Sequence, residues 1–450
     1  MIAWSLLVIF FSLSAWMLIW GLKEKERFYQ YPTLAGATWL FFLVPQAIGA
    51  LRNPYKFPDG VLGDHGLEIA LAMCILCAAA GWWGYNSEHW KKFGKKLSGV
   101  NYSPAAVFRM GAALYLVAFY FACRLAEVSG GFVRQFLGGG NYLLTWQGLP
   151  VMYVFFSTMM YPALLLCLIA YWHRPNTKKL IAVAAMSVYP LCATVFLGRR
   201  SSTAFLGLIA LLSVFFVKRW APSRRVFVAA IIAMGLFTII APQYRGNFGR
   251  NGIQHVKARS SIAEMLNGST YSEFDALVVL SALANSTMSF SYGIGIYNRT
   301  ISQLVPRQVV GERFKNSLMI HLDQPTSEEV YAWRIPCGSD PTGPLNAFQE
   351  FWFFGAFLYY VMGMFSRLLW EHAYQFGNIK AQVWYTIWAV IIPQTVYGSI
   401  SVIPGQLISF WLFLGILFLY GKAPAHWWRR RRATRIIQRE GRPNATPERI

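Results

Sequence analysis

The stretch IAWSLLVIFFSLSAWMLIW, residues 2–20, decides the fold class of this chain. It contains no charged side chain, and its length is close to the roughly 20 residues that a helix needs to cross a bilayer. A secretory signal peptide would begin with basic residues and end at a cleavage site with small side chains. This stretch has neither feature, so we expect it to be a retained transmembrane helix.

Similar apolar runs recur along most of the chain. They lie near residues 33–51, 66–85, 104–126, 149–172, 180–198, 202–217, 226–242, 348–369, 382–403 and 405–421. The 450 residues are 56% hydrophobic and only 13% charged, which is about half the charged fraction of soluble domains. Because only helices and closed barrels satisfy their backbone in lipid, the sequence predicts an all-α, polytopic membrane protein with about 11 transmembrane helices.

The net charge of +22 is distributed in a way that indicates membrane topology rather than nucleic-acid binding. Basic residues follow the first, third, fifth, seventh and eleventh runs, at Lys23, Lys25, Arg27, Lys91, Lys92, Lys95, Lys96, Arg174, Lys178, Lys179, Lys218, Arg219, Arg224, Arg225 and Arg429 to Arg432. With eleven spans all of them share one side, which the positive-inside rule makes cytoplasmic. We therefore expect no nucleic-acid partner.

This topology divides the chain into four parts. Residues 1–242 form eight helices, 243–347 a large periplasmic loop with interfacial helices, 348–421 three more helices, and 422–450 a basic cytoplasmic tail. Within the loop, residues 274–296 are apolar but interrupted by Asn and Gly, and we expect them not to span the membrane.

Arginines gather at the predicted periplasmic ends of the central helices. Gly198-Arg199-Arg200-Ser201 forms a short turn, and Tyr244-Arg245-Gly246 with Arg250 follows the eighth helix. A guanidinium presents a planar, permanently charged set of donors that suits a diphosphate. The alternative is that these side chains anchor the helices at the membrane surface.

Three further features lie on the same predicted side. Arg134 stands between two glycine runs and close to Tyr142 and Trp146, which indicates either sugar stacking or a flexible loop. Arg307 belongs to the large loop. Both arginines are candidates for diphosphate binding.

Glu350 is the candidate general base. Asn346 and Gln349 have capping-box spacing, which predicts that a helix begins there and that Glu350 lies in its first turn. A carboxylate at this position can take a proton from an acceptor hydroxyl, or it can simply stabilise the helix dipole. His255 and His321 are alternative bases. We expect no metal and no cofactor, because the sequence lacks HExxH, Cys/His metal spacing and a Walker loop.

Taken together, these motifs resemble the O-antigen polymerase (Wzy-type) family of oligosaccharide repeat-unit polymerases. The resemblance covers roughly residues 130–370 and rests on these segments: Gly198 to Ser202, Tyr244-Arg245-Gly246, Gly293 to Pro306-Arg307, Pro341 to Pro344 with Glu350, and Phe353-Phe354-Gly355.

The resemblance implies a GT-C-like glycosyltransferase in a bacterial inner membrane. It would polymerise undecaprenyl-diphosphate-linked repeat units into O-antigen or exopolysaccharide at the periplasmic face, in contact with membrane lipid and a chain-length regulator protein. Arg199, Arg200 and Arg245 match arginines expected to hold diphosphate, and Glu350 matches the acidic residue of the late-helix motif. Three alternatives remain: a flippase for lipid-linked glycan, a ligase-type enzyme, which would use a loop histidine, and a non-enzymatic partner protein of a polysaccharide assembly complex.

Overall fold

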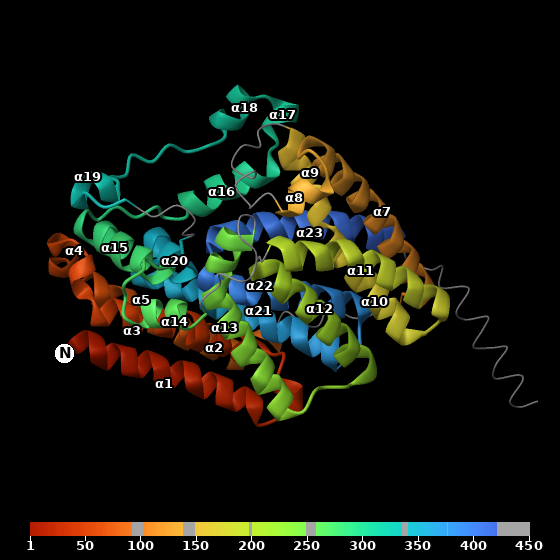
Figure 1. Cartoon of the computed structure of the whole chain (residues 1–450), viewed down its shortest axis with the longest axis horizontal. Helices are drawn as coiled ribbons and strands as arrows, with labels where there is room; N and C mark the ends of the chain where they lie inside the picture. The colour runs from red at the N-terminus through yellow and green to blue at the C-terminus, as the bar shows by residue number, and fades with distance from the viewer. Residues whose placement is uncertain are drawn as a thin grey trace, which may run out of the picture.

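A computed structural model describes residues 1–91, 102–137, 149–197, 200–248, 258–334, 341–375 and 377–420. All regular elements in these ranges are helices, and no strand occurs among them (Figure 1). The long helices are α1 (Ile2–Leu22), α5 (Gly66–Asn86), α7 (Pro104–Val128), α10 (Met160–His173), α11 (Thr177–Leu197), α12 (Arg200–Lys218), α13 (Arg224–Phe248), α15 (Glu273–Ser286), α21 (Ala356–Tyr374), α22 (Ile379–Tyr397) and α23 (Ile403–Tyr420). The shorter helices are α2 (Tyr31–Thr38), α3 (Val44–Arg52), α4 (Asp59–Gly63), α8 (Phe132–Leu137), α9 (Leu149–Thr158), α14 (Ala258–Leu266), α16 (Ile294–Leu304), α17 (Arg307–Val310), α18 (Glu312–Ser317), α19 (Ser327–Tyr331) and α20 (Gly343–Phe351).

Each predicted apolar run coincides with helical structure. Within the described residues, seven helical segments are long and apolar enough to cross a membrane: Ile2–Leu22, Tyr31–Arg52, Gly66–Asn86, Pro104–Val128, Met152–His173, Thr177–Phe196 and Gly343–Tyr374. This confirms a helical protein with membrane-spanning character. The count of eleven spans and the GT-C-like arrangement stay predictions.

The helices pack closely where glycines remove side-chain bulk. A Cβ on Gly363 of α21 would lie 2.1 Å from the carbonyl oxygen of Gly81 on α5, and one on Gly84 would lie 2.0 Å from that of Tyr360. Small residues of this kind let membrane helices approach without a hydrophobic driving force between them. The outer faces stay apolar, since Trp4, Val8 and other large side chains of α1 are exposed, as expected for a surface that faces lipid.

One end of the helical body, which we call the basic end, carries the turns 23–30, 87–91, 174–176 and 219–223, together with the C-terminal end of α21. Contacts between these turns show that they lie together. Arg219 donates a hydrogen bond to the backbone carbonyl of Tyr374, and Arg224 donates to that of Lys23. The structure therefore places basic turns from distant parts of the sequence at one end, as the charge pattern predicts.

The opposite end, which we call the distal end, is covered by α4 and by residues 258–334. In Figure 1 α4, α15 and α19 lie at the left and α16 to α18 lie toward the top, whereas the turn between α12 and α13 lies at the lower right. Asp275 at the start of α15 is fully buried against Lys56, whose Nζ lies 2.7 Å from Oδ1 and 2.8 Å from Oδ2. Burial raises the pKa of Asp275, and the Lys56 ammonium opposes that shift. Helix α15 itself is only 14 residues long and almost wholly buried.

Two helix boundaries close to predicted site residues differ from the sequence prediction. Helix α13 does not end near residue 242 but continues to Phe248, so Arg245 lies inside its last turn. Helix α20 begins at Gly343, with Thr342 as the N-cap that accepts a hydrogen bond from the backbone N–H of Leu345. The predicted cap at Asn346 is therefore wrong, and Glu350 lies in the last turn of α20 rather than the first. Pro344 explains the earlier start, because proline is favoured in the first turn of a helix.

Candidate functional site

A break between α22 and α23 opens the candidate site. The sequence predicts one helix over 382–403, but α22 ends at Tyr397 with Gly398 as its C-cap, and a short 3-10 turn, Ile400–Val402, precedes α23. Pro404 in the first turn of α23 accounts for the restart, because it lacks the N–H that a continuous helix needs. The hydroxyls of Ser399 and Ser401 lie within hydrogen-bond distance of each other at this break.

A polar cavity of about 670 Å³ lies between this break, α16 and the start of α20. It is lined by Gly295, Asn298, Arg299, Ser302, Pro341, Asn346, Ser399, Ser401 and Val402. Arg299 is exposed and forms no ion pair or hydrogen bond within the described part of the chain. The side-chain oxygen of Asn346 is buried, and no donor from the described residues reaches it. The cavity thus offers one free cation and one free acceptor to a ligand.

Glu350 packs against the N-terminus of α16, the helix that forms one wall of the cavity. Its side chain is only 4% exposed. Its Oε2 accepts a hydrogen bond from the backbone N–H of Gly293 at 2.9 Å, and its carboxylate also accepts from Gly295 and Ile296. A carboxylate at a helix N-terminus satisfies N–H groups that have no partner within the helix. Glu350 therefore stabilises a helix dipole, which is one of the two roles that the sequence suggests for it. The dipole is that of α16, however, and not that of its own helix.

Glycine at position 295 makes this contact possible. A Cβ there would lie 2.1 Å from Oε1 of Glu350, far inside van der Waals contact. The backbone of α16 can approach the carboxylate so closely because residue 295 has no side chain.

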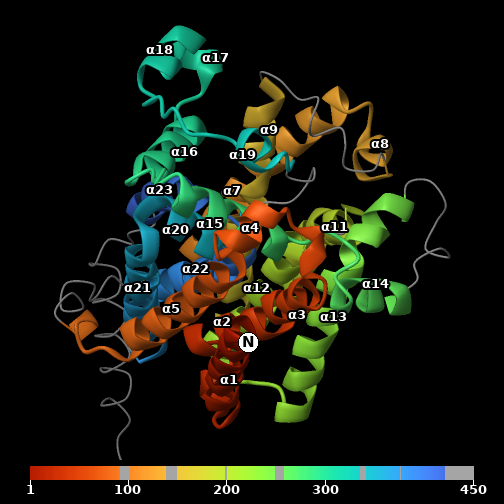
Figure 2. The ribbon, with the colours of Figure 1, turned by 90° about the vertical axis from the view of Figure 1, so that its left-hand side faces the viewer.

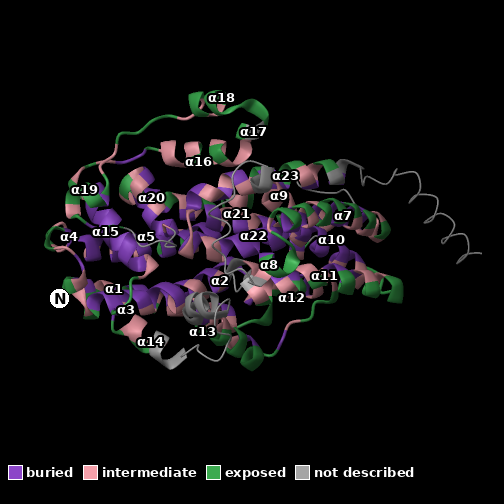
Figure 3. Ribbon diagram, turned by 45° about the horizontal axis from the view of Figure 1, so that its top comes forward, coloured by how far each residue is buried: buried purple, intermediate pink, exposed green. Residues whose placement is uncertain are grey.

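His321 and Arg307 lie in the arm that follows α16. Asn298 lines the cavity and also fixes this arm, donating to the carbonyl of Ile320 at 2.7 Å and accepting from its N–H at 3.0 Å. His321, the next residue, is exposed. Arg307 is exposed and stands 4.0 Å from Glu312. Figure 3 shows α17 and α18 as largely exposed helices outside the buried body.

The remaining predicted arginines belong to a different part of the molecule. Arg134 is exposed on α8, which packs against α11 through a hydrogen bond from Gln135 to the Tyr189 hydroxyl. Arg200 begins α12, and Arg245 lies near the end of α13. Figure 2 shows α8, α11 and α13 at the right and α16 at the upper left. Arg199, Arg250 and His255 lie outside the described residues.

Sequence reasoning missed most of the cavity. It gave no role to Arg299 and took Asn346 for a helix cap. Gly398, the two serines and Pro404 together would have indicated the helix break, because glycine and proline mark such boundaries. Nothing local in the sequence indicates that α16 lies beside it.

No protein-family model, no curated protein and no solved structure matches the chain. Among the described residues, no group of three His, Cys, Asp or Glu side chains is placed to hold a metal ion.

Proposed function

We propose that the chain is a membrane glycosyltransferase that polymerises undecaprenyl-diphosphate-linked oligosaccharide repeat units at its distal end. The observation that carries the proposal is the polar cavity beside α16, with a free guanidinium at Arg299 and a free carbonyl oxygen at Asn346. A diphosphate needs a cation such as the first, and a sugar hydroxyl can donate to the second. A site at the distal end also agrees with the predicted topology, in which the basic turns face the cytoplasm and the distal end faces the periplasm.

Two separate arginine-bearing regions suit a polymerase. The reaction joins two lipid-linked substrates, so two diphosphates must be held at once. Arg299 lines the cavity and Arg307 lies in the arm that follows α16, whereas Arg134, Arg200 and Arg245 belong to α8, α12 and α13. An arginine near the departing diphosphate would stabilise the charge that develops as the anomeric bond breaks.

Glu350 acts in this proposal as a positioning residue. Its carboxylate is buried and engaged by backbone N–H groups of α16, so in this conformation it holds the cavity wall in place. His321 is the proposed general base, because it is exposed and follows the residue that Asn298 clamps. A loop histidine also fits the ligase-type alternative, which would deliver the glycan to a different acceptor.

The test is a glycan ladder in a strain that lacks the chromosomal copy and carries Arg299→Ala. We expect the ladder to collapse to single repeat units, with lipid-linked precursor accumulating on the outer side. Arg313→Ala is the matched control, since this arginine is exposed on α18 and does not line the cavity; its ladder should be normal.

Each other outcome has a defined meaning. A full ladder with Arg299→Ala at normal protein level would remove the cavity from the proposal. Precursor that accumulates on the inner side in the deletion strain would favour a flippase. Polymer that forms normally but is not transferred to its final acceptor would favour a ligase.

A further inference from the structure

The arm that follows α16, residues 306–322, carries exposed apolar side chains at the edge of the molecule. Val309 and Val310 of α17 and Phe314 of α18 are 71%, 38% and 53% exposed, and Ile320 and Leu322, which follow α18, are 48% and 39% exposed. Figures 1 and 3 show α17 and α18 beyond α16, to the side of the long helices. Large apolar side chains that stay exposed together mark a surface that another molecule covers.

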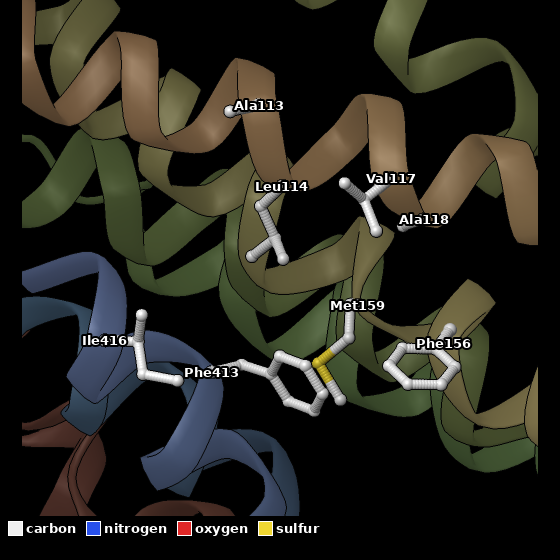
Figure 4. A pocket seen from close by; sticks show the side chains of 8 residues that line it. All are labelled: Ala113, Leu114, Val117, Ala118, Phe156, Met159, Phe413 and Ile416. Atoms are coloured by element: carbon white, nitrogen blue, oxygen red, sulfur yellow. The ribbon is translucent and has the colours of Figure 1, made fainter.

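The helical body contains an apolar pocket of about 210 Å³ between α7, α9, α10 and α23 (Figure 4). Its lining has no charged or polar side chain. The arm differs from this pocket, because charges stand among its apolar residues.

The charges of the arm are mainly positive. Residues 306–322 contain three cations, Arg307, Arg313 and Lys315, and one carboxylate, Glu312, which gives a net charge of +2. Both arginines are exposed. Cations interleaved with exposed apolar side chains are typical of segments that lie in the interface of a membrane, and each cation near an anionic lipid surface adds to the attraction.

Contacts with α16 fix the level of the arm. Lys315 donates from Nζ to a backbone carbonyl of α16 at 2.8 Å, and Asn298 of α16 holds the backbone of Ile320. Helix α16 in turn meets the start of α23, where a Cβ on Gly405 would lie 1.9 Å from Oε1 of Gln303. The 18 residues of α23 are largely apolar and measure about 27 Å, close to a hydrocarbon core of roughly 30 Å. The arm is therefore held beside the distal end of a helix that can cross most of a bilayer, which is where lipid headgroups lie.

We propose that the arm lies on the distal surface of the membrane, with its apolar side chains in the interface and its cations on anionic phospholipid headgroups. A protein partner would also cover apolar side chains, but the attachment beside the end of α23 brings lipid to the arm without a second protein. The inference does not depend on the proposed function, because lipid would cover the arm whatever ligand the polar cavity takes.

Helix α19 provides the contrast within the same end of the molecule. Val330 is 42% exposed, and its neighbours Glu328 and Glu329 are exposed carboxylates. An anionic lipid surface would repel this helix, although it too presents an apolar side chain.

The experiment uses the full chain in nanodiscs, with the photoreactive residue p-benzoylphenylalanine in place of Phe314. Irradiation in nanodiscs that contain phosphatidylglycerol should attach a lipid to the arm, as measured by mass spectrometry of its peptides. In nanodiscs of phosphatidylcholine alone the yield should fall at least about fivefold, the factor that corresponds to the attraction of one basic residue to an anionic surface. High salt should lower the yield with phosphatidylglycerol, because it screens exposed charges.

The same photoreactive residue in place of Val330 is the matched control, and its lipid yield should be low in both lipid compositions. Hydrogen exchange of the unmodified chain gives a second measurement that needs no variant. The amides of residues 307–317 should exchange more slowly with phosphatidylglycerol than with phosphatidylcholine, and those of 327–331 should exchange at the same rate in both.

Equal lipid yields at the two positions, or equal yields and equal exchange in the two compositions, would overturn the inference. A product in intact cells that joins the arm to another protein instead of to lipid would overturn it too, and would make the arm a partner-binding surface. None of these outcomes bears on the ladder of Arg299→Ala. Arg313→Ala remains a control for that ladder, because two cations and every apolar side chain of the arm stay in place.

Discussion

The two ends of the helical body differ in how most of their charged residues are placed. At the basic end, exposed cations contact backbone carbonyls and aromatic faces; the guanidinium of Arg219, for example, lies 4.0 Å from the ring centroid of Tyr374. The buried carboxylate near this end, Glu371, pairs with Arg367 of the same helix. At the distal end, Asp275 and Glu350 are buried and join segments far apart in the sequence. Exposed charges can orient a protein in a membrane while contributing little to its stability. Buried charges hold tertiary structure and are costly to leave without a partner.

The largest effect should come from Lys56→Met. Removing one partner of a buried ion pair costs about 3–5 kcal/mol, here measured as thermal unfolding in detergent micelles at pH 7. The control is Lys91→Met at the basic end, whose ion pair with Glu88 is exposed. Equal destabilisation by the two variants would contradict the difference between the ends.

The same variant has a pH dependence whose sign follows from Asp275. Because burial places its folded-state pKa above its ordinary value of 3.8, protonation favours the folded state, and this contribution is lost as the pH rises through the folded pKa. Without Lys56 the pKa of Asp275 in the folded state rises further, so the pH range over which this stabilisation is lost extends toward neutrality. Lys56→Met should therefore be destabilised less at pH 5 than at pH 7, in unfolding curves recorded at both values.

Glu350→Gln should have the next largest effect, about 1–3 kcal/mol, because an amide replaces a carboxylate that accepts from backbone N–H groups. The amides of Gly295 and Ile296 should exchange with solvent faster, as measured by hydrogen exchange. Glu312→Gln on the exposed α18 is the control. Unchanged exchange together with a selective loss of turnover would instead make Glu350 the general base.

Tyr331→Phe should cost about 1.5 kcal/mol, the lower end of the range for a hydrogen bond to a charged group. The Tyr331 hydroxyl donates to Asp64 at 2.6 Å and so connects α19 to the turn after α4. Burial raises the pKa of Tyr331 to about 12, so the cost should be constant from pH 6 to about 9. Tyr292→Phe, at an exposed tyrosine, serves as the control in the same unfolding assay.

The smallest effect should come from Arg219→Ala. Cation–π contacts at exposed sites contribute about 0.5–1 kcal/mol, so its unfolding midpoint should stay close to that of the wild type. A loss larger than that of Lys56→Met would show that the basic end, and not the distal end, holds the fold together.

The sequence by itself determined the class of fold and the polarity of the molecule. Apolar runs of about 20 residues favour helices in lipid, and each run coincides with helical structure, with a break after Tyr397 in the run 382–403. Within the described residues, basic turns from four parts of the sequence gather at one end, because helices of similar length that alternate in direction return their turns to the same side. Cys74 and Cys77, three residues apart, are buried on α5, as their position within an apolar run predicts.

Only the tertiary structure decided how the distal end is built. Local capping signals suggested a helix start at Asn346, but Thr342 and Pro344 start it earlier, and Glu350 then reaches the N-terminus of α16, 57 residues away in the sequence. The Lys56–Asp275 pair spans 219 residues. Such contacts depend on which helices become neighbours, and neither hydrophobic periodicity nor turn chemistry carries that information. The polar cavity has the same origin, since α16, the start of α20 and the break before α23 meet only in the folded chain.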